Sequence, residues 1–169
     1  MKITLTKVHY AAFASEETSC FDAVVCLDGI PSLTARNSGH GGCTDLNEIV
    51  PGSLAKLKAY AKTLPPVVCS DMRDPHDKSK PFSYEQSDEG LVDEALNEYL
   101  ALRDLRRLLK RTTAFVVNGE VRTFTKLPYV AQNFDRISAY LAKSHPTAKV
   151  LNGMKEDDAL ALYLHPAAA

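Results

Sequence analysis

The chain has 169 residues, of which 45% are hydrophobic and 24% are charged, and these proportions are typical of a soluble globular protein rather than a disordered or fibrous one. This length suffices for one domain that buries about two thirds of the surface exposed by the unfolded chain. The formal net charge of -1 lacks the basic excess typical of nucleic-acid-binding proteins, so only a local basic surface would support such a role.

The sequence also predicts the compartment of the protein. No apolar run approaches the roughly 18 residues that a membrane helix needs, and residues 1–7 lack the apolar segment of a signal peptide. The cysteines form no Cys-x-x-Cys pair and are too few for a disulfide framework, so we expect four free thiols, at Cys20, Cys26, Cys43 and Cys69. These features favour a protein that stays in a reducing cytoplasm and has no membrane segment.

Three strands are expected near the N-terminus. The first begins at Ile3 with alternating apolar and polar residues, and its faces are expected to slip before Phe13. The dipeptide Asp28-Gly29 predicts a tight hairpin, and a third strand is expected at residues 32–37. The strand before the hairpin has the period of two of a half-buried strand, with its apolar face formed by Phe21, Ala23, Val25 and Leu27.

This hairpin has a consequence for the loops at its open end. If the chain reverses at Asp28-Gly29, residues near Cys20 lie opposite those near Asn37. The polar bend at residues 15–18 and the glycine-rich loop at residues 39–42 then emerge at the same end of the sheet. We therefore expect one neighbourhood that contains Glu16, Glu17, Arg36, His40, Cys43 and Asp45.

The middle of the chain is expected to contain two helices and a loop between them. Ser53 is a suitable N-cap for a helix over residues 53–64, which two prolines would end. Residues 70–86 are polar and interrupted by prolines, and we interpret them as a mobile polar loop. The longest helix is predicted over residues 88–110, where an apolar stripe recurs at helical spacing and acidic and basic ends complement the helix dipole.

The remaining segments complete the predicted fold. Strands at residues 113–117 and 121–125 flank Asn118-Gly119, which predicts a second tight hairpin. A helix over residues 129–143 follows, and then a short extended piece and a last helix within residues 149–163. The fold expected is one α+β domain, in which the long helix packs on a three-stranded antiparallel sheet and the second hairpin and C-terminal helices complete the core.

The glycine-rich loop is the segment whose residues are best suited to binding or catalysis. Three glycines around His40 favour a rigid, exposed loop that either closes the sheet or presents backbone N–H groups to an anion. His40 with Asp45 and Glu16 or Glu17 would also offer ligands to a divalent metal. Cys43 would either form a thiolate–imidazole pair with His40 or behave as a small buried residue.

Standard catalytic signatures are absent from the sequence. It contains no phosphate-binding loop, no dinucleotide fingerprint, no zinc-deaminase pattern and no nucleophile elbow. We therefore assign no catalytic residue, no metal site and no cofactor.

A second candidate surface is the basic end of the long helix. Arg103, Arg107 and Arg111 recur every four residues, a spacing that would let them contact phosphates or an acidic protein together. Alternatively, these cations only complement the helix C-terminus, with Asp104 as an ion-pair partner.

Several segments at both ends of the chain resemble a family of small uncharacterised proteins encoded by tailed bacteriophages and prophages. They are FASEETSCF at residues 13–21, LDG at 27–29, NSGHGGC at 37–43, VLN at 150–152 and EDDALALY at 156–163. The resemblance implies expression in the cytoplasm of an infected bacterium, as an accessory protein rather than a component of the virion. It implies no catalytic role for any residue.

Two functional hypotheses follow from the sequence. The first is a phage accessory protein that binds and inhibits a host or anti-phage defence component, in an anti-CRISPR-like or other anti-defence role. The alternative is a protein that binds a small ligand or nucleotide, or a metal-assisted hydrolase, which uses the loop at residues 39–42. Nucleic-acid binding ranks third, and no oligomeric state is favoured. The candidate contact residues are Glu16, Glu17, Arg36, Asn37, His40, Gly41, Gly42, Asp45, Arg103 and Arg107.

Overall fold

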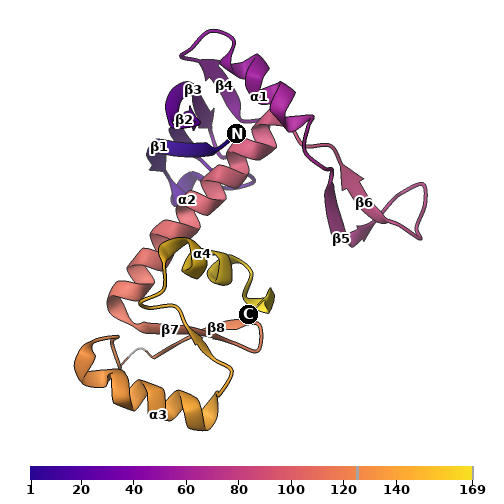
Figure 1. Cartoon of the computed structure of the whole chain (residues 1–169). Helices are drawn as coiled ribbons and strands as arrows, with labels where there is room; N and C mark the ends of the chain where they lie inside the picture. Colours follow the sequence, from indigo (N-terminus) through magenta and orange to yellow (C-terminus); the bar gives the residue numbers. More distant parts are fainter. Residues whose placement is uncertain (125, 169) are drawn as a thin grey trace. The chain divides into compact units, whose positions relative to one another are not determined.

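The computed structural model describes residues 1–124 and 126–168 and has the expected α+β class (Figure 1). By its internal contacts the chain divides into two compact units, which we call unit 1 (Met1–Asn97) and unit 2 (Glu98–Ala169). The sequence had been interpreted as one domain. The division falls inside a continuous helix, where no loop or change of composition marks it in the sequence.

Unit 1 is built on an antiparallel sheet in the order β1-β2-β3-β4. Its strands are β1 (Ile3–Tyr10), β2 (Phe21–Leu27), β3 (Ile30–Asn37) and β4 (Asp45–Glu48). The sheet therefore has four strands rather than the expected three. The fourth strand follows the glycine-rich loop and pairs with β3 from Arg36↔Asp45 to Leu33↔Glu48. It was missed because, in four residues, it has one apolar side chain and no clear alternation.

The predicted hairpin and its register are confirmed. Strand β2 pairs with β3 from Phe21↔Asn37 at the open end to Leu27↔Ile30 at the turn, where Asp28 has φ +52° and Gly29 φ +85°. Strand β1 contains the expected change of face, because its register with β2 shifts at a bulge where Lys7 has φ +50°. The apolar face predicted for β2 is buried, with Phe21, Ala23, Val25 and Leu27 each less than a tenth exposed.

Helix α1 (Ser53–Ala61) follows the sheet and is shorter than predicted. Its N-cap is Gly52 rather than Ser53, so the predicted cap was wrong. Ser53 is instead the first helical residue, and its buried hydroxyl donates a hydrogen bond of 2.9 Å to the carbonyl oxygen of Ser32. This bond joins the helix to β3, because a buried hydroxyl is stabilised by whichever acceptor packing brings close to it.

The segment interpreted as a mobile polar loop forms a hairpin instead. Strands β5 (Val67–Arg73) and β6 (Pro81–Tyr84) pair antiparallel, and the Asp74 carboxylate accepts hydrogen bonds from the backbone N–H groups of His76 and Asp77 in the turn between them. The pattern was misleading because none of the described side chains in the two strands is buried. Three of the large apolar ones, Val68, Met72 and Tyr84, are at least half exposed, and Val67 and Phe82 are half-buried.

The long helix α2 (Asp88–Arg111) is confirmed almost to the residue. In unit 1 it contributes the buried residues Leu91, Val92, Ala95 and Leu96. In unit 2 it contributes Leu105, which is 1% exposed. The apolar stripe that predicted the helix is thus the side that each unit buries.

Unit 2 is organised around a three-stranded sheet in the order β8-β7-β9. Strand β7 (Thr113–Val117) is wholly buried and pairs with β8 (Glu120–Phe124) across Asn118 and Gly119, which have φ +53° and +75°. On its other side it pairs with β9 (Lys149–Val150). The predicted second hairpin is therefore present, except that Thr125, expected at the end of its second strand, lies outside the described residues.

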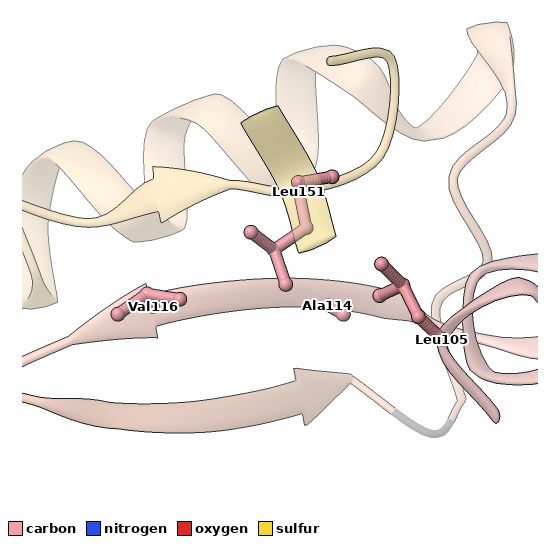
Figure 2. Packing of buried hydrophobic residues seen from close by; sticks show 5 residues of the cluster. Leu105, Ala114, Val116 and Leu151 are labelled. Atoms are coloured by element: carbon pink, nitrogen blue, oxygen red, sulfur yellow. The ribbon is translucent and has the colours of Figure 1, made fainter. Parts of the chain in front are cut away.

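Alternate residues of β7 pack into two apolar clusters on opposite faces of this sheet. In one cluster, Ala114 and Val116 pack against Leu105 of α2, Leu151 after β9 and Ala159 of helix α4 (Glu156–Leu164). Figure 2 shows four of these side chains with labels along β7. The other joins Phe115 and Val117 to Ile137 and Leu141 of α3 (Phe134–Ser144). Helix α3 begins later than predicted, after a 3-10 turn at Ala131–Asn133, so Tyr129 precedes the helix.

Candidate functional site

The two loops at the open end of the β2–β3 hairpin meet as the register predicted. The backbone carbonyl oxygen of Gly39 accepts hydrogen bonds from the N–H groups of Glu16, Glu17 and Thr18, at 2.9, 3.1 and 3.4 Å. We call the combined surface of residues 12–18 and 37–44 the rim. The three bonds to one oxygen place the acidic bend against the glycine-rich loop.

Asn37 is the internal support of the rim. Its side-chain oxygen accepts hydrogen bonds from the Thr18 hydroxyl (2.7 Å) and the Gly39 N–H (2.9 Å). Its NH₂ group donates to the Gly42 carbonyl oxygen and the Thr44 hydroxyl oxygen, each at 3.3 Å. Because Asn37 is only 7% exposed and uses both ends of its amide internally, its role is to hold the loop, whereas the sequence suggests a contact residue at this position.

Close backbone packing explains the first glycine of the loop. Gly39 has φ +89°, and a Cβ atom there would overlap the carbonyl oxygen of Ala14 and lie 2.7 Å from Cβ of Cys20. A Cβ atom on Gly41 would lie 2.5 Å from a carboxylate oxygen of Glu17, whose flexible side chain is able to move away. Gly42 also has φ +89° but faces open space.

His40 and Glu16 form the most direct side-chain pair of the rim. Nδ1 of His40 lies 3.2 Å from a carboxylate oxygen of Glu16, and both side chains are at least 60% exposed. Arg36 instead lies 3.6 Å from Asp22, its cross-strand partner in β2, rather than pairing with an acidic residue of the bend. Asp45 is exposed and opposite Arg36 in the β3–β4 ladder.

Cys43 fits neither alternative considered for it. It is exposed, so it is not a small buried residue. A hydrogen bond with Glu89 and the charge of that carboxylate raise the pKa of the Cys43 thiol, and the charges of Asp45 and Asp93 act in the same direction. The thiol form is therefore favoured, which disfavours a thiolate–imidazole pair with His40.

The surroundings of the loop are acidic. Thr44 donates a hydrogen bond of 2.9 Å to Asp93 of α2, and burial raises the pKa of that carboxyl, against the effect of the hydrogen bond. A polar hollow of about 270 Å³ lies beside the loop, lined in part by Glu17, Thr18 and Asp93. The N–H groups of Gly39 and Gly41 are already used, by Asn37 and by the Thr18 hydroxyl. These carboxylates and internal bonds make the loop a poor receptor for an anion.

A metal site would need a third ligand beside His40 and Glu16. Within residues 1–124 and 126–168, no three His, Cys, Asp or Glu side chains come together in a group that could hold a metal ion. The pair alone offers an exposed imidazole that lies within hydrogen-bond distance of a carboxylate.

Phe13 is the feature of the rim that the sequence did not reveal. It lies in the 3-10 turn η1 (Ala12–Ala14), and its side chain is 94% exposed, the largest value among the exposed large apolar residues. The turn is held at its base, where the Ser15 hydroxyl donates to Ala11 O and accepts from Cys20 N–H, both at 2.9 Å. In the sequence, Phe13 was read only as the end of a strand, because no local pattern distinguishes an aromatic residue that points to solvent.

The other candidate surface, the basic end of α2, is partly neutralised. Arg103 lies 3.1 Å and Arg107 3.8 Å from the Asp104 carboxylate. Arg106 donates two hydrogen bonds of 2.6 Å to Glu156 of α4. These contacts agree with the alternative in which the cations mainly stabilise the end of the helix, although Arg107 and Arg111 also line an open groove of about 320 Å³ beside Tyr163.

Comparisons with family models, with curated proteins and with solved structures found no match to this chain. Among the residues that the structure describes, no helix is both long and apolar enough to cross a membrane.

Proposed function

We propose that the protein is a phage-encoded accessory protein of the host cytoplasm, and that it acts by binding and inhibiting a protein of the host or of its anti-phage defence. The rim of unit 1 is the proposed contact surface. The observation that carries this proposal is the exposure of the Phe13 side chain, in a turn whose backbone is fixed by two hydrogen bonds of the Ser15 hydroxyl.

The exposed phenyl ring supports binding for an energetic reason. Burial of a phenylalanine side chain at an interface contributes about 1.5 to 3 kcal/mol relative to leaving it in water. Aromatic residues surrounded by polar ones commonly dominate interface energies. Because the hydrogen bonds of Ser15 and Asn37 already fix the backbone, little conformational entropy is lost when a partner covers the rim.

The charges of the rim indicate what kind of surface it fits. Glu16 and Glu17 adjoin Phe13 along the chain, and the described contacts leave Glu17 without an ion-pair partner. The nearby carboxylates of Asp45, Glu89 and Asp93 extend this acidic surface. A basic protein surface with an apolar pocket for Phe13 would be complementary to it.

The proposal is tested with two matched substitutions at opposite ends of the β1-β2-β3-β4 sheet. Phe13→Ser removes the displayed ring, and Ile30→Ser removes an apolar side chain that is 61% exposed at the turn end. The readouts are phage plating on defence-bearing hosts that express each variant, and capture of the bound protein from those cells. We expect Phe13→Ser to lose both and Ile30→Ser to retain both. Equal behaviour of the two variants would contradict a contact through the rim.

The alternative is that residues 39–42 form a site for a small ligand or nucleotide, or that the protein is a metal-assisted hydrolase that uses them. The exposed pair of His40 and Glu16 favours this alternative, because an imidazole and a carboxylate are groups that serve in acid–base catalysis. It is tested by thermal shift with nucleotides, cyclic nucleotides and divalent metals. A rise in melting temperature that disappears in His40→Ala would support the alternative. Partner capture that survives His40→Ala would support the rim. Capture lost only on charge reversal of Arg103 and Arg107 would instead move the contact to α2.

A further inference from the structure

Unit 2 contains an open groove that the proposed function does not use. Two adjoining hollows of about 340 and 450 Å³ lie between β8 and α3, and they share Phe124, Leu127 and Arg136 in their linings. Thr123 and Lys126 complete one hollow and Tyr140 the other. The groove therefore has apolar and aromatic walls with cations at its edge.

The aromatic walls of the groove are held in place by neighbouring rings. Phe124 packs on the buried ring of Phe115, with ring centroids 4.8 Å apart, and Tyr140 meets Phe124 edge-to-face at 5.1 Å and 88°. Tyr140 is nevertheless 48% exposed, so much of its ring faces solvent. Its ring also lies 6.1 Å from that of His145, so two neighbouring rings hold it, and its exposed part is a stacking surface for another planar group.

Two cations line the groove, Arg136 and Lys126, and a third, Lys143, lies beyond it on α3. Arg136, Tyr140 and Lys143 follow one another at i, i+4 and i+7 on α3, so they lie along one stripe of the helix. In the described part of the chain, no carboxylate lies within ion-pair distance of Arg136, Lys143 or Lys126. All three side chains are exposed, which leaves their charges available to an external anion.

The charge of unit 2 agrees with such a ligand. Residues 98–169 contain 11 lysines and arginines and 7 aspartates and glutamates, for a formal charge of +4. The net charge of -1 for the whole chain conceals this excess. Because exposed charges are screened beyond about 10 Å at 0.1 M salt, the local charge decides what binds in the groove.

We propose that this groove binds single-stranded nucleic acid. A base stacks on Tyr140 beside Phe124, and neighbouring phosphates are contacted by Arg136, Lys143 and Lys126. The combination of a fixed aromatic ring with unpaired cations along one groove is the arrangement that binds single strands without reading their sequence. An acidic polypeptide without aromatic residues, such as polyglutamate, would be attracted by the cations but would offer no ring to stack on Tyr140.

The proposal is tested on the full chain by fluorescence anisotropy with a labelled 20-nucleotide oligothymidylate. With three phosphate contacts, the logarithm of affinity should fall with the logarithm of salt concentration with a slope of about -2, and Arg136→Gln should reduce the slope by about 0.7. Tyr140→Ala should weaken binding about tenfold, whereas Tyr140→Phe, which keeps the ring, should retain it.

Two controls in the same unit match these substitutions. Tyr99→Ala removes a tyrosine of α2 that is 36% exposed, and Lys110→Gln removes an exposed cation of the same helix. Neither lines the groove, so both should bind the oligonucleotide like the wild type. Circular dichroism of each variant verifies that it is folded.

Three results would overturn the proposal. They are the absence of an anisotropy change at 20 mM salt, an equal loss of affinity in Lys110→Gln and Arg136→Gln, and binding of polyglutamate as tight as that of the oligonucleotide with no effect of Tyr140→Ala. The last result would show an acidic polypeptide as the occupant. None of these measurements depends on Phe13, so the proposed role of the rim stands or falls separately.

Discussion

The two units of this protein carry opposite charges. Residues 1–97 contain 9 lysines and arginines and 14 aspartates and glutamates, for a formal charge of -5, whereas residues 98–169 carry +4. Each unit displays an aromatic side chain among residues of its own charge, Phe13 in the first and Tyr140 in the second. The comparison shows that a chain-wide net charge near zero excludes little when the charges are segregated along the sequence.

The units are more alike in how they hold their loops. Each has a buried asparagine that uses both ends of its amide: Asn37 in unit 1 and Asn152 in unit 2, both 7% exposed. Asn152 accepts a hydrogen bond from Ala114 N–H (2.7 Å) and donates to Leu109 O (3.2 Å) and Thr112 O (3.0 Å). Asn37 fixes the exposed loops of the rim, whereas Asn152 links the end of α2 to the start of β7. A buried asparagine therefore stabilises an exposed surface in unit 1 and an internal junction in unit 2.

The largest expected effect comes from Gly39→Ala, which disrupts the close packing of the glycine-rich loop in unit 1. The new methyl group would overlap Ala14 and Cys20 at a residue with φ +89°, so the free energy of unfolding should fall by about 3 kcal/mol or more. Urea unfolding measures the loss, and amide hydrogen exchange should place it in residues 11–44.

Gly42→Ala is the matched control for this change. Gly42 has the same φ of +89° but no atom within 4 Å of an added Cβ, so only backbone strain remains and the loss should be about 1 kcal/mol. Equal losses in the two variants would contradict the close packing of Gly39, because strain alone would then explain both.

In unit 2, Asn152→Ala is the corresponding substitution of a residue that holds two segments together. It removes three hydrogen bonds and leaves the buried N–H of Ala114 without its acceptor, which should cost about 2 kcal/mol. Faster hydrogen exchange should be confined to β7 and the end of α2. Asn133→Ala, which removes one exposed hydrogen bond to Pro128 O, is the control and should change stability by less than about 0.5 kcal/mol.

Most of the fold was predictable where local chemistry and packing agree. Asp28-Gly29 and Asn118-Gly119 fixed both hairpins, and the apolar stripe fixed α2, because each signal is short-range and also matches the buried face. Strand β4 and the β5–β6 hairpin were missed for the opposite reason. Their pairing is determined by neighbouring strands and turn hydrogen bonds, and their exposed side chains leave no periodic pattern in the sequence.

The candidate site was predictable in place but not in detail. Register alone brought Glu16 and His40 together, since a hairpin reversal sets which loops share an end. The exposure of Phe13 and the burial of Asn37 depend on tertiary packing of loops that have no local signature. The groove at Tyr140 was also missed, because the side chains of α3 alone do not reveal that Phe124 packs beside the helix.

Smaller effects should appear at single carboxylates, with opposite signs in the two units. In unit 1, burial raises the pKa of Asp93 above its ordinary value of 3.8, so the folded protein holds its ionised form at a cost. Asp93→Asn should therefore raise the melting temperature slightly at pH 7. The gain should shrink as the pH falls through the raised pKa, because the wild-type carboxyl then becomes neutral as well. A lower melting temperature at pH 7 would show that the bond from Thr44 needs a charged acceptor.

In unit 2, the hydrogen bonds from Arg106 lower the pKa of Glu156 below its ordinary value of 4.5. A lowered pKa means that the ionised carboxylate stabilises the folded state above the unfolded pKa, and that this contribution is lost as the pH falls through the folded value. Glu156→Gln should therefore lower the melting temperature at pH 7 by a small amount, since the pair is exposed and screened, and this effect should diminish as the pH falls through the lowered pKa. Thermal melts of both variants at pH 7 and at a series of lower pH values give the sharpest form of the comparison. Opposite shifts are expected because the two causes differ: burial destabilises the ionised Asp93, whereas Arg106 stabilises the ionised Glu156. A shift in the same direction for the two variants at pH 7 would contradict one of these two assignments.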